Sequence, residues 1–160
     1  MSYRLLLIDS NAARCQMLRD MLQPTFAVTA VPTVADAYEI LCSQHGALPH
    51  GVVLDVSATS SMRFLCALKQ DPPFAGIPVC AITLRSLMRD RDEAARERAA
   101  FSQAGTLGFL VYPGLPHQQI VPYLRLFVRS GHLIQARPTP SVDPDLLTER
   151  EQAMIAQCRQ

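Results

Sequence analysis

Short apolar runs alternate with helical patterns along the first 130 residues, and this alternation restricts the possible folds more than any other feature of the sequence. One run, residues 26–31, mixes apolar and polar residues, which places it nearer the edge of a sheet. Parallel neighbouring strands need helical crossovers, so the alternation predicts an α/β fold with a doubly wound, five-stranded parallel sheet. The other four runs are apolar throughout, as strands are when both faces are buried; they cover residues 5–8, 52–54, 79–82 and 109–111.

Five helical patterns lie between and after these runs. In the second pattern, Thr33 and Asp36 are spaced as a capping pair. Pro122 lies inside the last pattern, where it should kink the helix or delay its start. The fourth pattern is rich in Arg, Glu and Ala, whereas the others repeat apolar residues at helical spacing. The patterns lie at about residues 17–22, 34–41, 62–68, 87–103 and 120–128.

Composition excludes several classes of protein. No stretch has the 18 or more apolar residues that a membrane span needs, and the N-terminus lacks a signal-peptide cleavage site. The five cysteines are scattered without zinc-site spacing, which is typical of reduced thiols in a cytoplasmic protein. A net charge of +1 argues against a nucleic-acid-binding surface on this segment.

Polar residues follow three of the predicted strands. Asp9, Asp55 and Thr83 come directly after the runs at 5–8, 52–54 and 79–82. Function in doubly wound sheets collects at the carboxyl ends of the strands, so we expect these side chains to lie together. For a single aspartate, local turn hydrogen bonds would be the simpler explanation. Two carboxylates can share Mg²⁺ with water and backbone oxygens, and a carboxylate beside Mg²⁺ and a hydroxyl suits acyl-phosphate formation.

Taken in order and spacing, four segments resemble the receiver domain of bacterial two-component response regulators, over about residues 3–130. The resemblance implies that Asp55 is the phosphoacceptor, Thr83 the switch hydroxyl and Phe109 the switch aromatic residue. It also implies Mg²⁺ bound by Asp9, Asp55 and the backbone carbonyl of Ser57, and a sensor histidine kinase as partner. The matching segments are LLLID (5–9), VVLD (52–55), IPVCAIT (77–83) and AGTLGFLVYP (104–113).

The departures from this family are concentrated around Asp55. Ser10 stands where the family has a second acid, and Tyr112 stands at the position of its usual lysine. Lys69, the single lysine of the chain, cannot substitute, because the helix that carries it runs away from the site. We therefore expect weak or absent Mg²⁺ binding and slow, weak or absent phosphorylation, unless Arg85 supplies a compensating cation.

The segment between Thr83 and Gly105 is about seven residues longer than is usual in the family, or about two helical turns. The added length carries mixed charges at 89–98, which suit a solvated helix face. Receivers of this family commonly dimerise through the face formed by the fourth helix, fifth strand and fifth helix. The charged run is thus either a plain solvated face or part of a homodimer interface.

The sequence divides into a receiver domain at 1–130, a Pro-rich linker at 131–145 and the start of another domain at 146–160. Thr148 and Glu151 form a capping box that begins a new helix. The segment LLTERE (146–151) resembles the opening of LuxR/NarL-type helix-turn-helix domains, which implies a transcription regulator that contacts DNA only through residues beyond this chain. A tail helix that docks back on the domain is the alternative.

These observations favour a non-enzymatic, signal-receiving domain that controls an attached DNA-binding domain, with an incomplete acid pocket around Asp55. The alternative is a phosphorylation-independent pseudo-receiver that acts as a dimerisation module or binds a ligand or partner. An enzyme is disfavoured, because none of the four histidines has a nucleophile partner at a suitable position.

Overall fold

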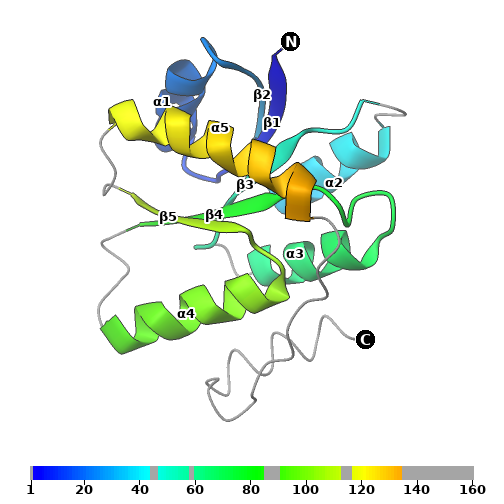
Figure 1. The fold of residues 1–160 in the computed structure, drawn as a ribbon, viewed down its shortest axis with the longest axis vertical. Coiled ribbons are helices and arrows are strands. Elements are labelled where there is room, and N and C mark those ends of the chain that lie inside the picture. The colour runs from blue at the N-terminus through cyan, green and yellow to red at the C-terminus, as the bar shows by residue number, and fades with distance from the viewer. Residues whose placement is uncertain (1, 44–46, 58–59, 85–90, 113–116, 135–160) are drawn as a thin grey trace.

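A five-stranded parallel sheet forms the centre of the computed structural model, which describes residues 2–43, 47–57, 60–84, 91–112 and 117–134 (Figure 1). The strand order is β2-β1-β3-β4-β5, and every neighbouring pair is parallel. This is the flavodoxin-like doubly wound order. It confirms the predicted fold and the edge position of residues 26–31. The strands are β1 (Tyr3–Ile8), β2 (Phe26–Val31), β3 (Gly51–Asp55), β4 (Val79–Leu84) and β5 (Gly108–Tyr112).

Helices cover both faces of the sheet, and each face has its own apolar core. Helices α1 and α5 lie on one face, while α2, α3 and α4 lie on the other (Figure 1). The strands supply alternate side chains to the two cores, which is why their sequences are apolar at nearly every position. The helices are α1 (Ala12–Leu22), α2 (Val34–Ser43), α3 (Ser61–Gln70), α4 (Arg91–Ala104) and α5 (His117–Ile134).

The predicted capping pair at the start of α2 is confirmed. The Asp36 amide donates to Thr33 Oγ1 at 3.1 Å, and that hydroxyl donates to Asp36 Oδ2 at 2.7 Å. The Thr33 side chain thereby satisfies a backbone donor that has no partner within the helix.

Helix α5 is longer at both ends than the sequence pattern suggested. It begins at His117, ahead of Pro122, so of the two effects expected from this proline, a kink or a delayed start, the delayed start was wrong. It also continues to Ile134, past Gly131, where the pattern had been expected to stop. A Cβ at Gly131 would lie 2.5 Å from the Pro78 side chain, so glycine serves here for close packing and does not end the helix.

Residues 131–134 of the predicted linker therefore belong to α5. The remainder of the linker and residues 146–160 lie outside the described residues, and the division into three segments stays a prediction.

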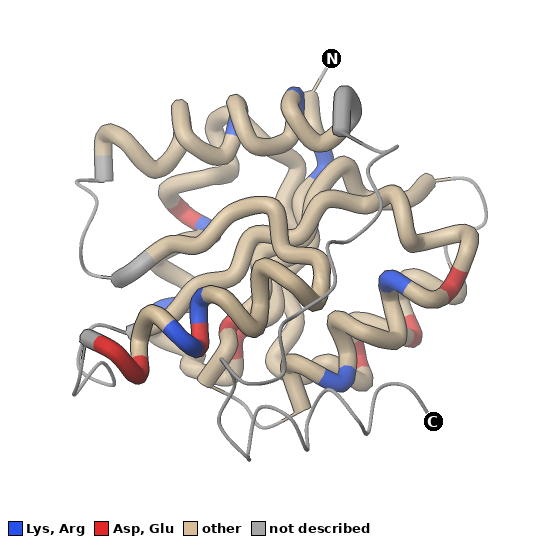
Figure 2. The backbone as a smooth tube through the Cα atoms, turned by 60° about the horizontal axis from the view of Figure 1, so that its bottom comes forward, with Lys and Arg blue, Asp and Glu red and all other residues tan. Residues whose placement is uncertain are grey.

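Charged residues of both signs are interspersed on the helices. Figure 2 shows them alternating along α4, whose sequence contains Asp92, Glu93, Arg96, Glu97 and Arg98. Within the described ranges, no helix combines the length and apolarity needed to cross a bilayer.

Candidate functional site

The two predicted acidic residues lie side by side at the carboxyl ends of β1 and β3. Ile8 pairs with Leu54 in the sheet, so Asp9 and Asp55 occupy equivalent places on adjacent strands. Both are buried, with 1% and 3% of their surface exposed. Buried carboxylates are costly unless they are paired and hydrogen-bonded. Their partners therefore define the chemistry of the site.

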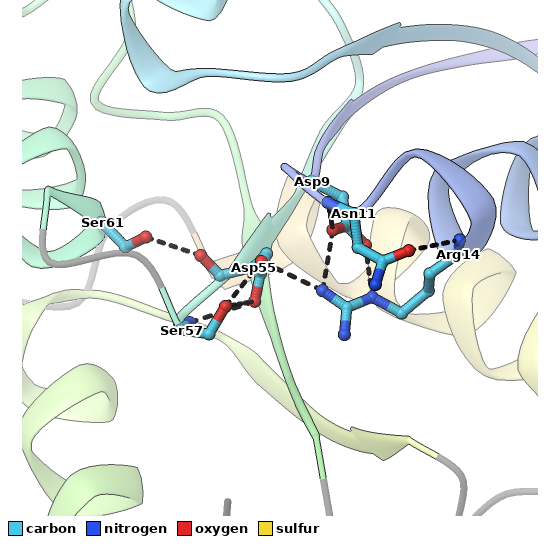
Figure 3. Close-up of polar contacts among 6 residues, drawn as sticks. All are labelled: Asp9, Asn11, Arg14, Asp55, Ser57 and Ser61. Carbon is cyan, nitrogen blue, oxygen red and sulfur yellow. Dashed lines mark hydrogen bonds and ion pairs between the residues drawn. The ribbon is translucent and has the colours of Figure 1, made fainter.

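The cation that meets both carboxylates is Arg14, from the first turn of α1 (Figure 3). Its Nε donates to Asp9 Oδ2 at 2.5 Å, and its Nη2 donates to Asp9 Oδ1 at 2.7 Å. The same Nη2 lies 3.0 Å from Asp55 Oδ2, which makes a second ion pair. Arg14 is itself buried, with 7% of its surface exposed. One guanidinium thus bridges the ends of two neighbouring strands.

Asn11 fixes the start of the helix that carries Arg14. Its side-chain Oδ1 accepts a hydrogen bond from the Arg14 amide at 2.9 Å, as an N-cap residue does. Its own amide donates to Asp9 Oδ1 at 2.9 Å. The turn between β1 and α1 is therefore held at both ends, and this places the guanidinium over the carboxylates.

Serines of the loop after β3 complete the surroundings of Asp55. The Ser57 hydroxyl is 2.8 Å from both carboxylate oxygens, and the Ser57 amide donates to Oδ1 at 3.0 Å. The buried Ser61 hydroxyl donates to the Asp55 backbone carbonyl at 2.6 Å. Each of the four carboxylate oxygens of Asp9 and Asp55 consequently has at least one donor or cationic partner.

The residues present do not fit the magnesium site that the family resemblance implies. Ser10, which replaces the second acid, is exposed, while the guanidinium of Arg14 lies between the two carboxylates that would bind the ion. Within the described ranges, no three His, Cys, Asp or Glu residues group as metal ligands would. Ser57, expected to offer its carbonyl, directs its amide and hydroxyl at Asp55.

The structure places Thr83 at the same end of the sheet, where the carboxyl ends of the strands lie. Asp55 pairs with Ile82 of β4, so the buried Thr83 follows immediately at the strand end. Tyr112 ends β5 and pairs with Leu84; its side chain lies outside the described residues, so its place at the family's lysine position stays a prediction. Arg85, considered as a compensating cation, also lies outside them.

Phe109 lies on β5, and 9% of its surface is exposed. The guanidinium carbon of Arg98, from α4, is 5.5 Å from the centre of its ring, within the range of a cation–π contact. Both residues line a hollow of about 340 Å³ between α4 and β5. The aromatic side chain at the predicted switch position is thus covered by a cation from the neighbouring helix.

Lys69 lies far from the acidic residues, as predicted. Its Nζ donates to the carbonyls of Ala75 and Ile77 at 3.2 and 2.6 Å, ahead of β4 and so at the opposite end of the sheet. Burial lowers the pKa of Lys69 to about 8. Its aliphatic stem packs beneath Gly105, which has a φ of 116° and where a Cβ would lie 2.9 Å from Lys69 Cγ.

Sequence reasoning missed Arg14, although the sequence contained a signal. Arg14, Leu18 and Leu22 recur every four residues and are the buried residues of α1. A cation in the first turn of a helix opposes the helix dipole, so a nearby negative charge is needed to favour it. An arginine on the apolar face of a helix, in the turn where the dipole disfavours a cation, therefore indicates that buried acidic residues lie nearby.

The sequence matches no protein-family model and no curated protein. Its fold, by contrast, is found among solved structures of receiver domains. The signal receiver domain of a signal transduction histidine kinase from Syntrophus aciditrophicus aligns with a TM-score of 0.66 and 15% identity, over 89% of this chain and 99% of that one.

Two further receiver domains align in the same way. A CheY-like response regulator receiver domain protein from Methanospirillum hungatei JF-1 has a TM-score of 0.64 and 15% identity, over 83% of this chain and 98% of its own. One from Clostridium thermocellum has a TM-score of 0.64 and 16% identity, over 82% and 98%. The chain therefore has the receiver fold.

Proposed function

We propose that this chain is a signal-receiving regulatory domain of a two-component response regulator and has no enzymatic role of its own. The observation that carries the proposal is the cluster of Asp9, Asp55 and Thr83 at one edge of a sheet with receiver topology. In this proposal the signal comes from a sensor histidine kinase in the cytoplasm. The output is an attached DNA-binding domain of LuxR/NarL type, which begins at about residue 146.

A second candidate, a phosphorylation-independent pseudo-receiver, is favoured by the contacts of Asp55. Ser57 and Arg14 contact its two carboxylate oxygens. The oxygen that attacks a phosphoryl group would first have to lose these contacts. In this candidate the domain acts as a dimerisation module or binds a ligand or partner. The face formed by α4, β5 and α5, with its hollow beside Phe109, is the surface we propose for that contact.

One experiment separates the two candidates. The chain is incubated with Mg²⁺ and either acetyl phosphate or beryllofluoride, and its intact mass and oligomeric state are followed. A mass gain with acetyl phosphate that is lost in Asp55→Asn supports phosphorylation-dependent signalling. Asp20→Asn is the matched control, because Asp20 is exposed on α1 and its loss should leave the mass gain unchanged.

An unchanged mass together with a constitutive dimer supports the pseudo-receiver. A monomer that gains no mass and binds no beryllofluoride would contradict phosphorylation-dependent signalling and the dimerisation role, and would favour a pseudo-receiver that binds a ligand or partner.

A further inference from the structure

We infer that Arg14 is the resident cation of this pocket: its guanidinium takes the place of a divalent metal ion and keeps Mg²⁺ out. This inference goes beyond the proposed function, because it concerns which cation the pocket holds, whatever output the domain controls. It rests on the position, burial and anchoring of a single side chain.

The guanidinium lies where a shared metal ion would have to lie. It contacts one oxygen of Asp55 and both oxygens of Asp9, at distances between 2.5 and 3.0 Å. These are the two carboxylates that a hard cation would use on adjacent strand ends. A divalent ion placed between them would displace the guanidinium or share the oxygens with it.

Burial makes sharing unfavourable. Side-chain exposure is 6% for Arg14, 0% for Asp9 and 3% for Asp55. Like charges repel more strongly where water does not screen them, so a guanidinium and Mg²⁺ cannot both be accommodated cheaply there. The guanidinium also neutralises one of the two negative charges that would attract the metal ion.

Displacement is opposed by the anchoring of α1. Asn11 caps the helix at the Arg14 amide, and its own amide binds Asp9. Arg14 shares the buried side of α1 with Leu18 and Leu22, so its stem leaves the helix from a packed position. Ser10, by contrast, is exposed and offers no carboxylate to a metal ion.

A Mg²⁺ titration of the 160-residue chain followed by amide NMR tests this inference. The amides of Asn11 and Ser57 report on the site, because each donates to one of the two carboxylates. In the wild type we expect neither amide to shift in a saturable way. In Arg14→Met, which keeps an apolar stem and removes the charge, both should shift, with Mg²⁺ affinity at least about tenfold higher.

Arg19→Ala is the matched control, since Arg19 is an exposed cation on the same helix. It removes one positive charge without touching the carboxylates, and it should behave as the wild type. Arg14→Gln gives a second neutral side chain if Arg14→Met does not fold.

Saturable Mg²⁺ binding by the wild type at these two amides would overturn the inference, even if no variant folded. Equal affinities in wild type and Arg14→Met would also overturn it, because Arg14 would then not be what excludes the metal. Neither outcome would contradict the proposed regulatory function, which is tested separately through Asp55.

Discussion

At the scale of single residues, one arginine determines which cation the two aspartates of the pocket bind. A buried carboxylate pair repels itself, and receiver-like sequences are expected to relieve this repulsion with a metal ion. Here Arg14 contacts both carboxylates, while Ser57 donates to Asp55 and Asn11 to Asp9. Removing one member of such a buried set costs about 3–5 kcal/mol, because the remaining charges lose their compensation.

Lys69 gives a prediction about pH that is independent of the pocket. Its pKa is about 8 in the folded protein because of burial, against an ordinary value near 10.5. Between these values the unfolded chain binds more protons than the folded one, so stability rises with pH. We expect the free energy of unfolding of the wild type to gain about 2 kcal/mol relative to Lys69→Met from pH 8 to pH 10.5.

Urea unfolding at the two pH values measures this gain, and Lys69→Met serves as the reference because all other groups titrate equally in both proteins. As the chain has a single lysine, its side-chain NMR signal can be titrated without overlap. An equal pH slope in the two proteins would show that Lys69 keeps its ordinary pKa.

The sequence predicted the positions of Asp9, Asp55 and Thr83 in the sheet, because each directly follows a recognisable apolar run. It did not predict what neutralises the acids. Arg14 is five residues from Asp9 and 41 from Asp55, and its role depends on how α1 is aimed across the strand ends. Side-chain direction of this kind follows from tertiary packing, which periodicity alone does not contain.

At the scale of elements, the strands were predicted within about two residues, while helix ends were less certain. The boundary of α5 shows the reason. Glycine and proline are common at helix ends, yet Gly131 and Pro122 both lie inside α5. Gly131 is explained by its close packing against Pro78, which lies 53 positions earlier in the chain, so no local sequence pattern could reveal it. Packing against a distant segment overrode local preference.

The contact between Gly131 and Pro78 predicts a destabilising substitution. Alanine favours helices over glycine, so Gly131→Ala would stabilise an exposed helix by about 1 kcal/mol. Here its Cβ would lie 2.5 Å from the Pro78 ring, and α5 would have to shift. We expect a net loss of about 1–3 kcal/mol in the free energy of unfolding, measured with urea.

Arg129→Ala, at an exposed position two residues earlier, is the matched control and should change stability little. A Gly131→Ala protein as stable as the wild type would show that α5 does not depend on this close approach.

At the scale of the whole molecule, the proposed contact face leads to a prediction about assembly. Leu126 on α5 is 65% exposed, the largest exposure among the large apolar side chains of the described residues. It lies one helical turn from Tyr123. The Tyr123 hydroxyl is so close to Gly108 of β5 that a Cβ on this glycine would collide with it. Leu126 is therefore on the side of α5 that continues toward β5 and α4.

If the domain dimerises through this face, Leu126→Arg should weaken the dimer at least about tenfold by placing a charge in an apolar contact. Sedimentation or light scattering over a concentration series measures the change. Arg125→Ala, about 100° away around the helix, should leave the dimer intact. A dimer unaffected by Leu126→Arg would place the interface elsewhere.

The bridge made by Arg14 has a consequence for how such a domain depends on its surroundings. A dissolved ion exchanges with the medium, can be stripped by a chelator and varies with cellular supply. A guanidinium is synthesised with the chain, in a fixed ratio of one per pocket, and cannot diffuse away. In the folded domain the ends of β1 and β3 are then joined by the chain's own side chain. Control of this pocket would have to act on the polypeptide itself, by moving a helix, and not on the availability of a metal.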